Sequence, residues 1–113
     1  MGRSGSGKST LLHCLAGLLV PDTGEIWFGE QRLDNLGDTG RSGRRLNEMG
    51  IVFQFGHLVP ELTLLENVAL PLMATGTKRS AAESRATELL DRLEITVLAD
   101  RRPSEVSGGE MQR

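Results

Sequence analysis

The sequence has little cysteine, no long apolar run and no excess of one charge. Each of these absences argues against one class of protein. Cys14 is the one cysteine, so no internal disulfide framework is expected, and this usage fits a reducing compartment. The longest apolar stretch, residues 68–74, contains Pro71 and is far shorter than the ~20 residues that cross a bilayer. Thirteen basic residues against fifteen acidic ones give no field that would hold nucleic acid by charge alone.

Length and composition predict one ordered domain at most. The chain has 113 residues, of which 38% are apolar, and adding its 14 glycines brings it level with the ~45–50% typical of globular proteins. No secretory signal is expected, because the glycine- and serine-rich start has no apolar segment behind a basic one. We therefore expect a soluble, cytoplasmic, single-domain piece without a transmembrane segment.

The first half of the chain predicts a helix, a hairpin and a loop. Periodicity indicates a helix after residue 7, and its apolar stripe comprises Leu11, Leu12, Leu15, Ala16, Leu18 and Leu19. Residues 25–28 and 31–33 are β-prone and separated by Gly29 and Glu30, which predicts a short hairpin. Residues 34–43 are expected to form a loop because they are rich in glycine, aspartate and serine, with a short basic helix around residues 44–49.

The second half predicts a buried strand followed by two helices. Residues 51–53 form a short apolar run that is consistent with a buried strand. Thr63 and Glu66 have the spacing of a capping box, and the helix after them should bend at Pro71. A clearer amphipathic helix is predicted over residues 80–93, with a buried stripe of Ala82, Ala86, Leu89, Leu90 and Leu93. Helices mixed with few strands indicate the α/β class.

Residues 2–9 match the phosphate-loop pattern G-x-x-x-x-G-K-[ST] without a mismatch. Glycines let successive backbone N–H groups turn toward a phosphate, and the helix that follows directs its positive end at the same anion. Lys8 can reach the β- and γ-phosphates, and the Ser9 hydroxyl can ligate Mg²⁺. The predicted phosphate-binding residues are Gly2, Arg3, Ser4, Gly5, Ser6, Gly7, Lys8, Ser9 and Thr10.

Two further segments restrict the class of phosphate-loop protein. Gln54 ends the predicted strand, and a Ser107-Gly108-Gly109 turn stands where another helix would begin. Ser107 could cap that helix, and the two glycine amides would be available to an anion. Two such anion sites are hard to arrange around one nucleotide in so short a chain, so the second is expected to serve a nucleotide on another copy.

At these residues the sequence resembles the ATP-binding domain of ABC transporters. Residues 2–9 correspond to the Walker A loop, Gln54 to the Q-loop glutamine and residues 107–110 to the family signature. Val106 and Glu110 depart from the usual Leu and Gln without altering the Ser-Gly-Gly core. Residues 53–63, 66–68 and 99–103 are similar to the lipoprotein-release and macrolide-export branch.

The resemblance implies an α/β fold, the phosphate-loop NTPase of ABC type, in incomplete form. It implies a phosphate-loop helix, a small antiparallel β piece and a helical subdomain, without much of the central parallel sheet. The parts would be residues 1–62 with the phosphate loop, hairpin and Q-loop, residues 63–106 as the helical subdomain and residues 107–113 with the signature. The helices that begin at Lys8 and Ser107 would then have little sheet on which to bury their apolar stripes.

The resemblance also implies ligands and partners. ATP would lie on residues 2–10, and Ser9 and Gln54 would surround Mg²⁺. The nucleotide of the opposite subunit in a head-to-tail dimer would be contacted by Ser107, Gly108, Gly109 and Glu110. A membrane permease would be the second partner and would hold the protein at the inner face of the cell membrane.

The same resemblance implies that no catalytic residue lies in these 113 residues. The family's Walker B Asp, its adjacent Glu and its switch His follow the signature helix, so we expect an internal fragment of an exporter ATPase that does not hydrolyse ATP by itself. The alternatives are a non-hydrolysing nucleotide-binding module and another phosphate-loop enzyme such as a small-molecule kinase. Gln54 and the Ser107-Gly108-Gly109 turn disfavour the kinase.

Several conspicuous side chains receive ordinary interpretations. His13 is expected to be a partly buried helix residue, His57 a loop residue and Cys14 a small buried apolar residue. Trp27 is expected to pack rather than to stack on a nucleobase. Solvent-exposed positions are predicted for Arg41, Arg44, Arg45, Arg101 and Arg102.

Overall fold

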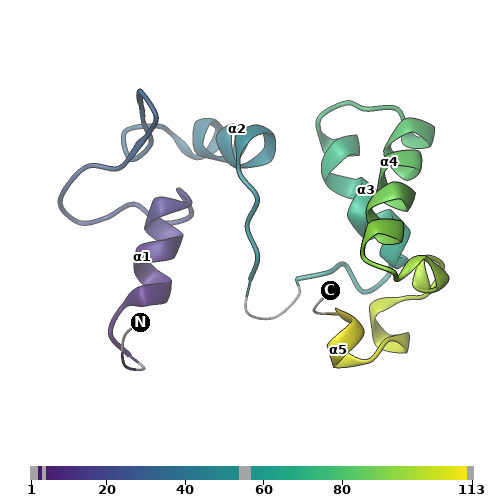
Figure 1. Cartoon of the computed structure of the whole chain (residues 1–113). Coiled ribbons are helices and arrows are strands. Elements are labelled where there is room, and N and C mark those ends of the chain that lie inside the picture. The colour runs from purple at the N-terminus through teal and green to yellow at the C-terminus, as the bar shows by residue number, and fades with distance from the viewer. Residues whose placement is uncertain (1–2, 4, 54–56, 112–113) are drawn as a thin grey trace. The chain divides into compact units, whose positions relative to one another are not determined.

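The computed structural model describes residues 3, 5–53 and 57–111, and its contacts divide the chain into two compact units (Figure 1). Met1–Ile51 form the first unit and Val52–Arg113 the second. Among the described residues the sheet is a single antiparallel pair of strands and the other regular elements are helices. This content agrees with the predicted incomplete α/β fold.

The first unit contains the predicted hairpin. Strands β1 (Trp27–Phe28) and β2 (Gln31–Arg32) pair with Trp27 opposite Arg32 and Phe28 opposite Gln31. Asp34 closes the open end of the hairpin, because its carboxylate accepts from the Ile26 N–H at 2.7 Å and from Arg32 Nη2 at 2.7 Å. Between these contacts the Leu33 side chain is only 1% exposed, so a local apolar centre and an ion pair together hold the hairpin.

Helix α2 (Asp38–Glu48) corrects the prediction of a loop over residues 34–43. Gly40 and Gly43 lie inside this helix, although glycine disfavours helix interiors by about 1 kcal/mol. Ion pairs one turn apart oppose that cost, since Arg41 pairs with Asp38 and Arg44 with Glu48. Side-chain ion pairs therefore stabilise this helix, although its glycine content predicted a loop.

Helix α1 (Lys8–Leu15) follows the phosphate-loop segment as predicted, but it contains no buried residue. Its leucines Leu11, Leu12 and Leu15 are 60%, 64% and 51% exposed. An apolar stripe is normally buried against a sheet or another helix. This exposure is the outcome expected for a stripe with little sheet to cover it.

The second unit contains two helices packed against each other, α3 (Leu64–Ala74) and α4 (Arg79–Arg92) (Figure 1). Ala69, Ala82 and Ala86 are fully buried between them, with Leu65, Val68 and Leu72 packed around. Alanine side chains allow the two helix backbones to approach closely and still exclude water. The buried positions Ala82, Ala86 and Leu90 confirm most of the predicted stripe of α4, while Leu93 is exposed.

The start of α3 confirms the capping box. The Glu66 N–H donates to Thr63 Oγ1 at 3.2 Å, and the Thr63 N–H donates to Glu66 Oε2 at 3.0 Å. The segment that follows α4 adds two acceptors, because the Leu64 and Leu65 N–H groups donate to Arg101 O and Ala99 O at 2.9 and 3.0 Å. The N–H groups of the first turn of α3 are thus satisfied within the second unit.

The Asn67 side chain ties the preceding loop to α3. Its Oδ1 accepts from the Val59 N–H at 2.7 Å, and its Nδ2 donates to Val59 O at 3.1 Å and to Thr63 O at 2.9 Å. One amide therefore fixes both backbone groups of Val59 relative to the helix. The unit ends with two 3₁₀ turns, η1 (Thr96–Leu98) and η2 (Pro103–Glu105), and helix α5 (Gly108–Met111).

The predicted strand over residues 51–53 is wrong. These residues adopt no regular structure, and Val52 is 98% exposed. A buried strand needs a neighbouring strand for its backbone hydrogen bonds, and the two strands among the described residues pair with each other.

Among the residues that the structure describes, no helix is long and apolar enough to cross a membrane.

Candidate functional site

The glycine-rich loop leads directly into α1. Arg3, Gly5, Ser6 and Gly7 are described, whereas the predicted site residues Gly2 and Ser4 lie outside the described residues. Gly5 and Gly7 both have φ of +78°, the left-handed conformation that residues with a Cβ rarely adopt. A Cβ on either glycine would meet no atom within 4 Å, so the space beside the loop is open.

The Lys8 ammonium folds back over this loop. Its Nζ donates to the Arg3 carbonyl at 2.6 Å and lies 3.2 Å from Ser6 Oγ. The Ser6 N–H also donates to the Arg3 carbonyl, at 3.3 Å, which closes a tight turn. The cation of Lys8 is therefore held on the same short loop whose glycines leave room for a ligand.

The N-terminus of α1 is suited to an anion. Gly7 is its N-cap and supplies no side-chain cap, and the first turn contains no acidic residue. The first helical hydrogen bond runs from the Leu11 N–H to the Gly7 carbonyl at 2.9 Å. The N–H groups of a first turn have no acceptor within their own helix, and the helix dipole adds positive potential there. Ser9 and Thr10 place two exposed hydroxyls on this turn.

These residues fit a polyphosphate with a magnesium ion. Backbone N–H groups and an ammonium supply the donors that phosphate oxygens accept. The Ser9 hydroxyl is a hard oxygen ligand, and Mg²⁺ usually takes one or two protein ligands together with phosphate oxygens and water. A metal site built only from protein side chains would need several ligating residues close together. Within residues 3, 5–53 and 57–111 no group of three His, Cys, Asp or Glu side chains could hold a metal.

The other predicted site residues are not brought to this loop by any described contact. Gln54 lies outside the described residues. Ser107, Gly108 and Gly109 are exposed at the start of α5, as expected for a turn that begins a helix, and Glu110 lies within α5. The glycine-rich loop and this turn belong to different units.

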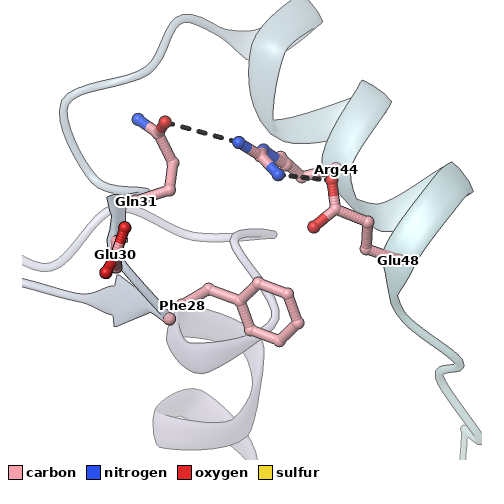
Figure 2. A pocket seen from close by; sticks show the side chains of 6 residues that line it. Phe28, Glu30, Gln31, Arg44 and Glu48 are labelled. Carbon is pink, nitrogen blue, oxygen red and sulfur yellow. Dashed lines mark hydrogen bonds and ion pairs between the residues drawn. The ribbon is translucent and has the colours of Figure 1, made fainter.

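A hollow of about 630 Å³ lies between the hairpin and α2, and Figure 2 shows the side chains that line it. Phe28, Glu30 and Gln31 line it from the hairpin, and Arg44 and Glu48 line it from α2. The Arg44 guanidinium already pairs with Glu48 and lies 3.3 Å from Gln31 Oε1. Because its charge is compensated in this way, the hollow is a weaker anion site than the glycine-rich loop.

Shifted carboxyl groups mark structural contacts rather than reactive ones. The Arg32 guanidinium, followed by the Ile26 N–H, lowers the pKa of Asp34 below its ordinary value. The Thr63 N–H, with a smaller contribution from Arg79, lowers the pKa of Glu66 in the same direction. Both carboxylates are fixed by the hairpin or the helix cap, which leaves them structural roles.

Two sequence interpretations are corrected by their contacts. Trp27 is 57% exposed and donates from its indole N–H to Glu25 at 3.1 Å, so it is not a packing residue. Arg41 and Arg45 are half-buried rather than fully exposed, since the Arg41 side chain is only 12% exposed and Arg45 donates to the Gly17 carbonyl at 2.7 Å. Their i,i+4 spacing, which places both on one helix face, was the available signal. His13 is half-buried and His57 is exposed, as expected, whereas Cys14 is half-buried rather than buried.

Comparison with known proteins gives one consistent result. The sequence profile of the family described as ABC transporter matches residues 1–113. A lipoprotein-releasing system ATP-binding protein LolD from Saccharophagus degradans is 48% identical over 113 residues, which are 100% of this chain and 50% of that protein. A LolD from Cereibacter sphaeroides is 50% identical over 111 residues, or 97% of this chain and 49% of that protein.

Solved structures agree with the sequence relatives. The ATP-binding cassette MJ0796, solved as a dimer in a post-hydrolysis state with bound ADP and Pi, has a TM-score of 0.92 and 37% identity. The match covers 99% of this chain and 50% of that one. A second dimeric structure of MJ0796, described as a bacterial ABC transporter cassette, matches equally well. The chain thus spans about half the length of the curated relatives it matches.

Proposed function

The chain belongs to the ABC transporter family, and from that premise we propose that residues 2–10 bind the triphosphate of ATP. The observation that carries the proposal is the Lys8 ammonium, held 2.6 Å from the Arg3 carbonyl on a loop with left-handed Gly5 and Gly7. A phosphate oxygen is a stronger acceptor than that carbonyl, because hydrogen bonds between two charged groups are shorter and stronger than those to neutral ones. We therefore propose that Lys8 turns from the Arg3 carbonyl toward the ligand on binding.

The remaining site residues receive roles from the family resemblance. Ser9 and Gln54 would hold Mg²⁺, and Gln54 would also sense the γ-phosphate. Ser107, Gly108, Gly109 and Glu110 would face the nucleotide bound by a second subunit. The dimeric form of the cassette MJ0796 supports this arrangement. In the division into residues 1–62, 63–106 and 107–113, the first part would hold ATP and Mg²⁺, the second would be the helical subdomain, and the third would face the nucleotide of the second subunit.

In the longer protein we propose that ATP hydrolysis drives a membrane exporter of the lipoprotein-release type. The two LolD proteins that are 48% and 50% identical support this substrate class. The partners would be a membrane permease and a second ATP-binding domain, and the protein would sit at the cytoplasmic face of the membrane through the permease. Phosphoryl transfer to water also needs a residue that positions the water. The 113 residues are proposed to bind ATP without hydrolysing it.

A titration of the 113-residue chain with Mg-ATP tests the proposal. Lys8→Ala should weaken binding at least about tenfold, because a hydrogen bond to a charged group contributes about 1.5–3 kcal/mol. Lys78→Ala is the matched control, since it removes the other lysine of the sequence at an exposed position in the second unit. Equal affinity of the wild type and Lys8→Ala would refute the site.

A phosphate-release assay on the same samples distinguishes ATP binding alone from ATP hydrolysis. We expect no release above the rate without protein, because the family resemblance implies that the residue that positions the water lies outside these 113 residues. Steady Mg-dependent release that Lys8→Ala abolishes would replace the proposal of a binding fragment with that of a complete ATPase.

A further inference from the structure

The end of α1 opposite the phosphate loop is held by α2. Helix α1 closes with hydrogen bonds from the Leu18 N–H to the His13 carbonyl at 2.8 Å and from the Gly17 N–H to the Cys14 carbonyl at 2.9 Å. Gly17 has φ of +65°, which completes a Schellman motif. This conformation favours glycine and leaves the Gly17 carbonyl available to a donor outside the helix.

Arg45 of α2 supplies that donor. Its Nη1 donates to the Gly17 carbonyl at 2.7 Å, while its Nη2 donates to Ser42 Oγ at 2.7 Å. The second bond anchors the guanidinium on its own helix, one turn before Arg45. A planar guanidinium with both ends bound has little freedom to leave the carbonyl.

Arg41 completes the contact from the preceding turn of α2. Gly17 is buried, and a Cβ on it would lie 3.5 Å from Arg41 Cδ, so the stem of Arg41 packs directly over this glycine. The Arg41 guanidinium is held by the Leu36 carbonyl at 2.5 Å and by an ion pair with Asp38. Gly17 is therefore enclosed by two arginines whose own positions are fixed.

This contact matters because α1 has so little else to hold it. No residue of α1 is buried, so apolar packing contributes little to its orientation. A cation near a helix C-terminus also interacts favourably with the helix dipole. The direction of the helix axis determines where the N–H groups of the first turn point, at the other end.

We propose that Arg45 is a positioning residue for the phosphate loop. By fixing the Gly17 carbonyl on α2, it sets the direction in which α1 presents Lys8, Ser9 and the first-turn amides. The inference deepens the proposed ATP site and rests on it. The bond joins the end of α1 to α2, and both lie in the first unit.

Matched arginine variants of the 113-residue chain test the proposal. Arg45→Ala should weaken Mg-ATP binding about fivefold, the loss of one ordinary hydrogen bond. Arg44→Ala removes the same charge from the same helix, but its partners are Glu48 and Gln31, so binding should not change. Arg45→Lys should recover most of the affinity, because an ammonium can still donate to the Gly17 carbonyl. Equal affinities of Arg45→Ala and Arg44→Ala would overturn the inference.

Amide hydrogen exchange without nucleotide keeps the inference separate from the proposed function. Arg45→Ala should speed exchange of the Leu18 amide at least about fivefold, and it should leave Ala86 of α4 unchanged as an internal reference for folding. Should the wild type fail to bind Mg-ATP, the proposed function fails and exchange alone decides whether Arg45 fixes α1. Unchanged exchange at Leu18 in Arg45→Ala, or identical acceleration in Arg45→Ala and Arg45→Lys, would overturn it.

Discussion

The starts of α1 and α3 are built in opposite ways within one short chain. At α3 the N–H groups of Leu64, Leu65 and Glu66 all have acceptors, two of which are carbonyls from residues 99 and 101. At α1 the N-cap is Gly7, without a side-chain cap and without an acidic residue in the first turn. At the start of α3 the backbone N–H groups are hydrogen-bonded within the protein, which stabilises the helix. The start of α1 remains electropositive and suited to an anion.

The apolar faces of the two helices differ in the same sense. Ala69 of α3 is fully buried against Ala82 and Ala86 of α4, whereas the leucines of α1 are more than half exposed. Burial of apolar area is the main favourable term in folding. The comparison indicates that α3 and α4 stabilise themselves, while α1 depends on the Arg45 contact and, in our proposal, on its ligand.

The largest expected effect comes from a buried charge in α4. Ala86→Asp should destabilise the second unit by at least about 3 kcal/mol, because it places an unpaired carboxylate between two helices. Leu12→Asp in α1 should change the free energy of unfolding by no more than about 0.5 kcal/mol, since Leu12 is 64% exposed. Urea denaturation followed by circular dichroism measures both.

Ala81→Asp is the control for that pair, because residue 81 is exposed on the same helix. It should leave stability close to that of the wild type. A strongly destabilised Leu12→Asp would contradict the comparison by showing that the face of α1 is covered in solution.

A smaller effect is expected from the two hydroxyls that begin the helices. Thr63→Ala removes the cap of α3 and should cost about 1 kcal/mol of stability. Ser9→Ala removes a hydroxyl from the first turn of α1, where it caps nothing in the described contacts, and should be neutral for stability. Equal costs from the two substitutions in thermal denaturation would remove the distinction between the two helix starts.

A still smaller, stabilising effect is expected at the end of α4. This helix closes like α1, with the Ile95 N–H bonded to the Leu90 carbonyl at 3.0 Å, but the left-handed position is occupied by Glu94 with φ of +58°. Glu94→Gly should relieve that strain and gain about 0.5 kcal/mol after the entropic cost of glycine. Glu94→Ala, which keeps the Cβ, should give no such gain in the same denaturation experiment.

The pH dependence of stability should also separate the helix starts. The Thr63 N–H and Arg79 lower the pKa of Glu66 from its ordinary value of 4.5, so the folded state favours the carboxylate. Its contribution is complete above the ordinary pKa and is lost as the pH falls through the lower folded pKa. The difference in melting temperature between the wild type and Glu66→Gln should therefore shrink below about pH 4.5. A difference that stays constant down to pH 3 would contradict this role.

The sequence predicted those features that depend on residues only a few positions apart. The capping box of Thr63 and Glu66, the hairpin around Gly29 and the turn at Gly5 and Gly7 each act within a few residues, and each appears in the structure. The second half of helix α2 was predicted as a short basic helix around residues 44–49. Its first half was predicted as a loop because of its glycines, while a contact from Arg45 to Gly17, 28 residues away, helps to hold the helix. Apolarity over residues 51–53 indicated burial, but it could not specify a partner strand.

Residue-resolved amide exchange of the 113-residue chain, with and without Mg-ATP, tests the central claim most directly. Without nucleotide, the amides of Ala86 and Leu90 in α4 should exchange slowly and those of Leu12 and Leu15 in α1 much faster. Saturating Mg-ATP should slow the α1 amides selectively, because a ligand that binds one region stabilises that region. Equal protection of α1 and α4 without nucleotide, or no slowing in α1 with it, would contradict the account.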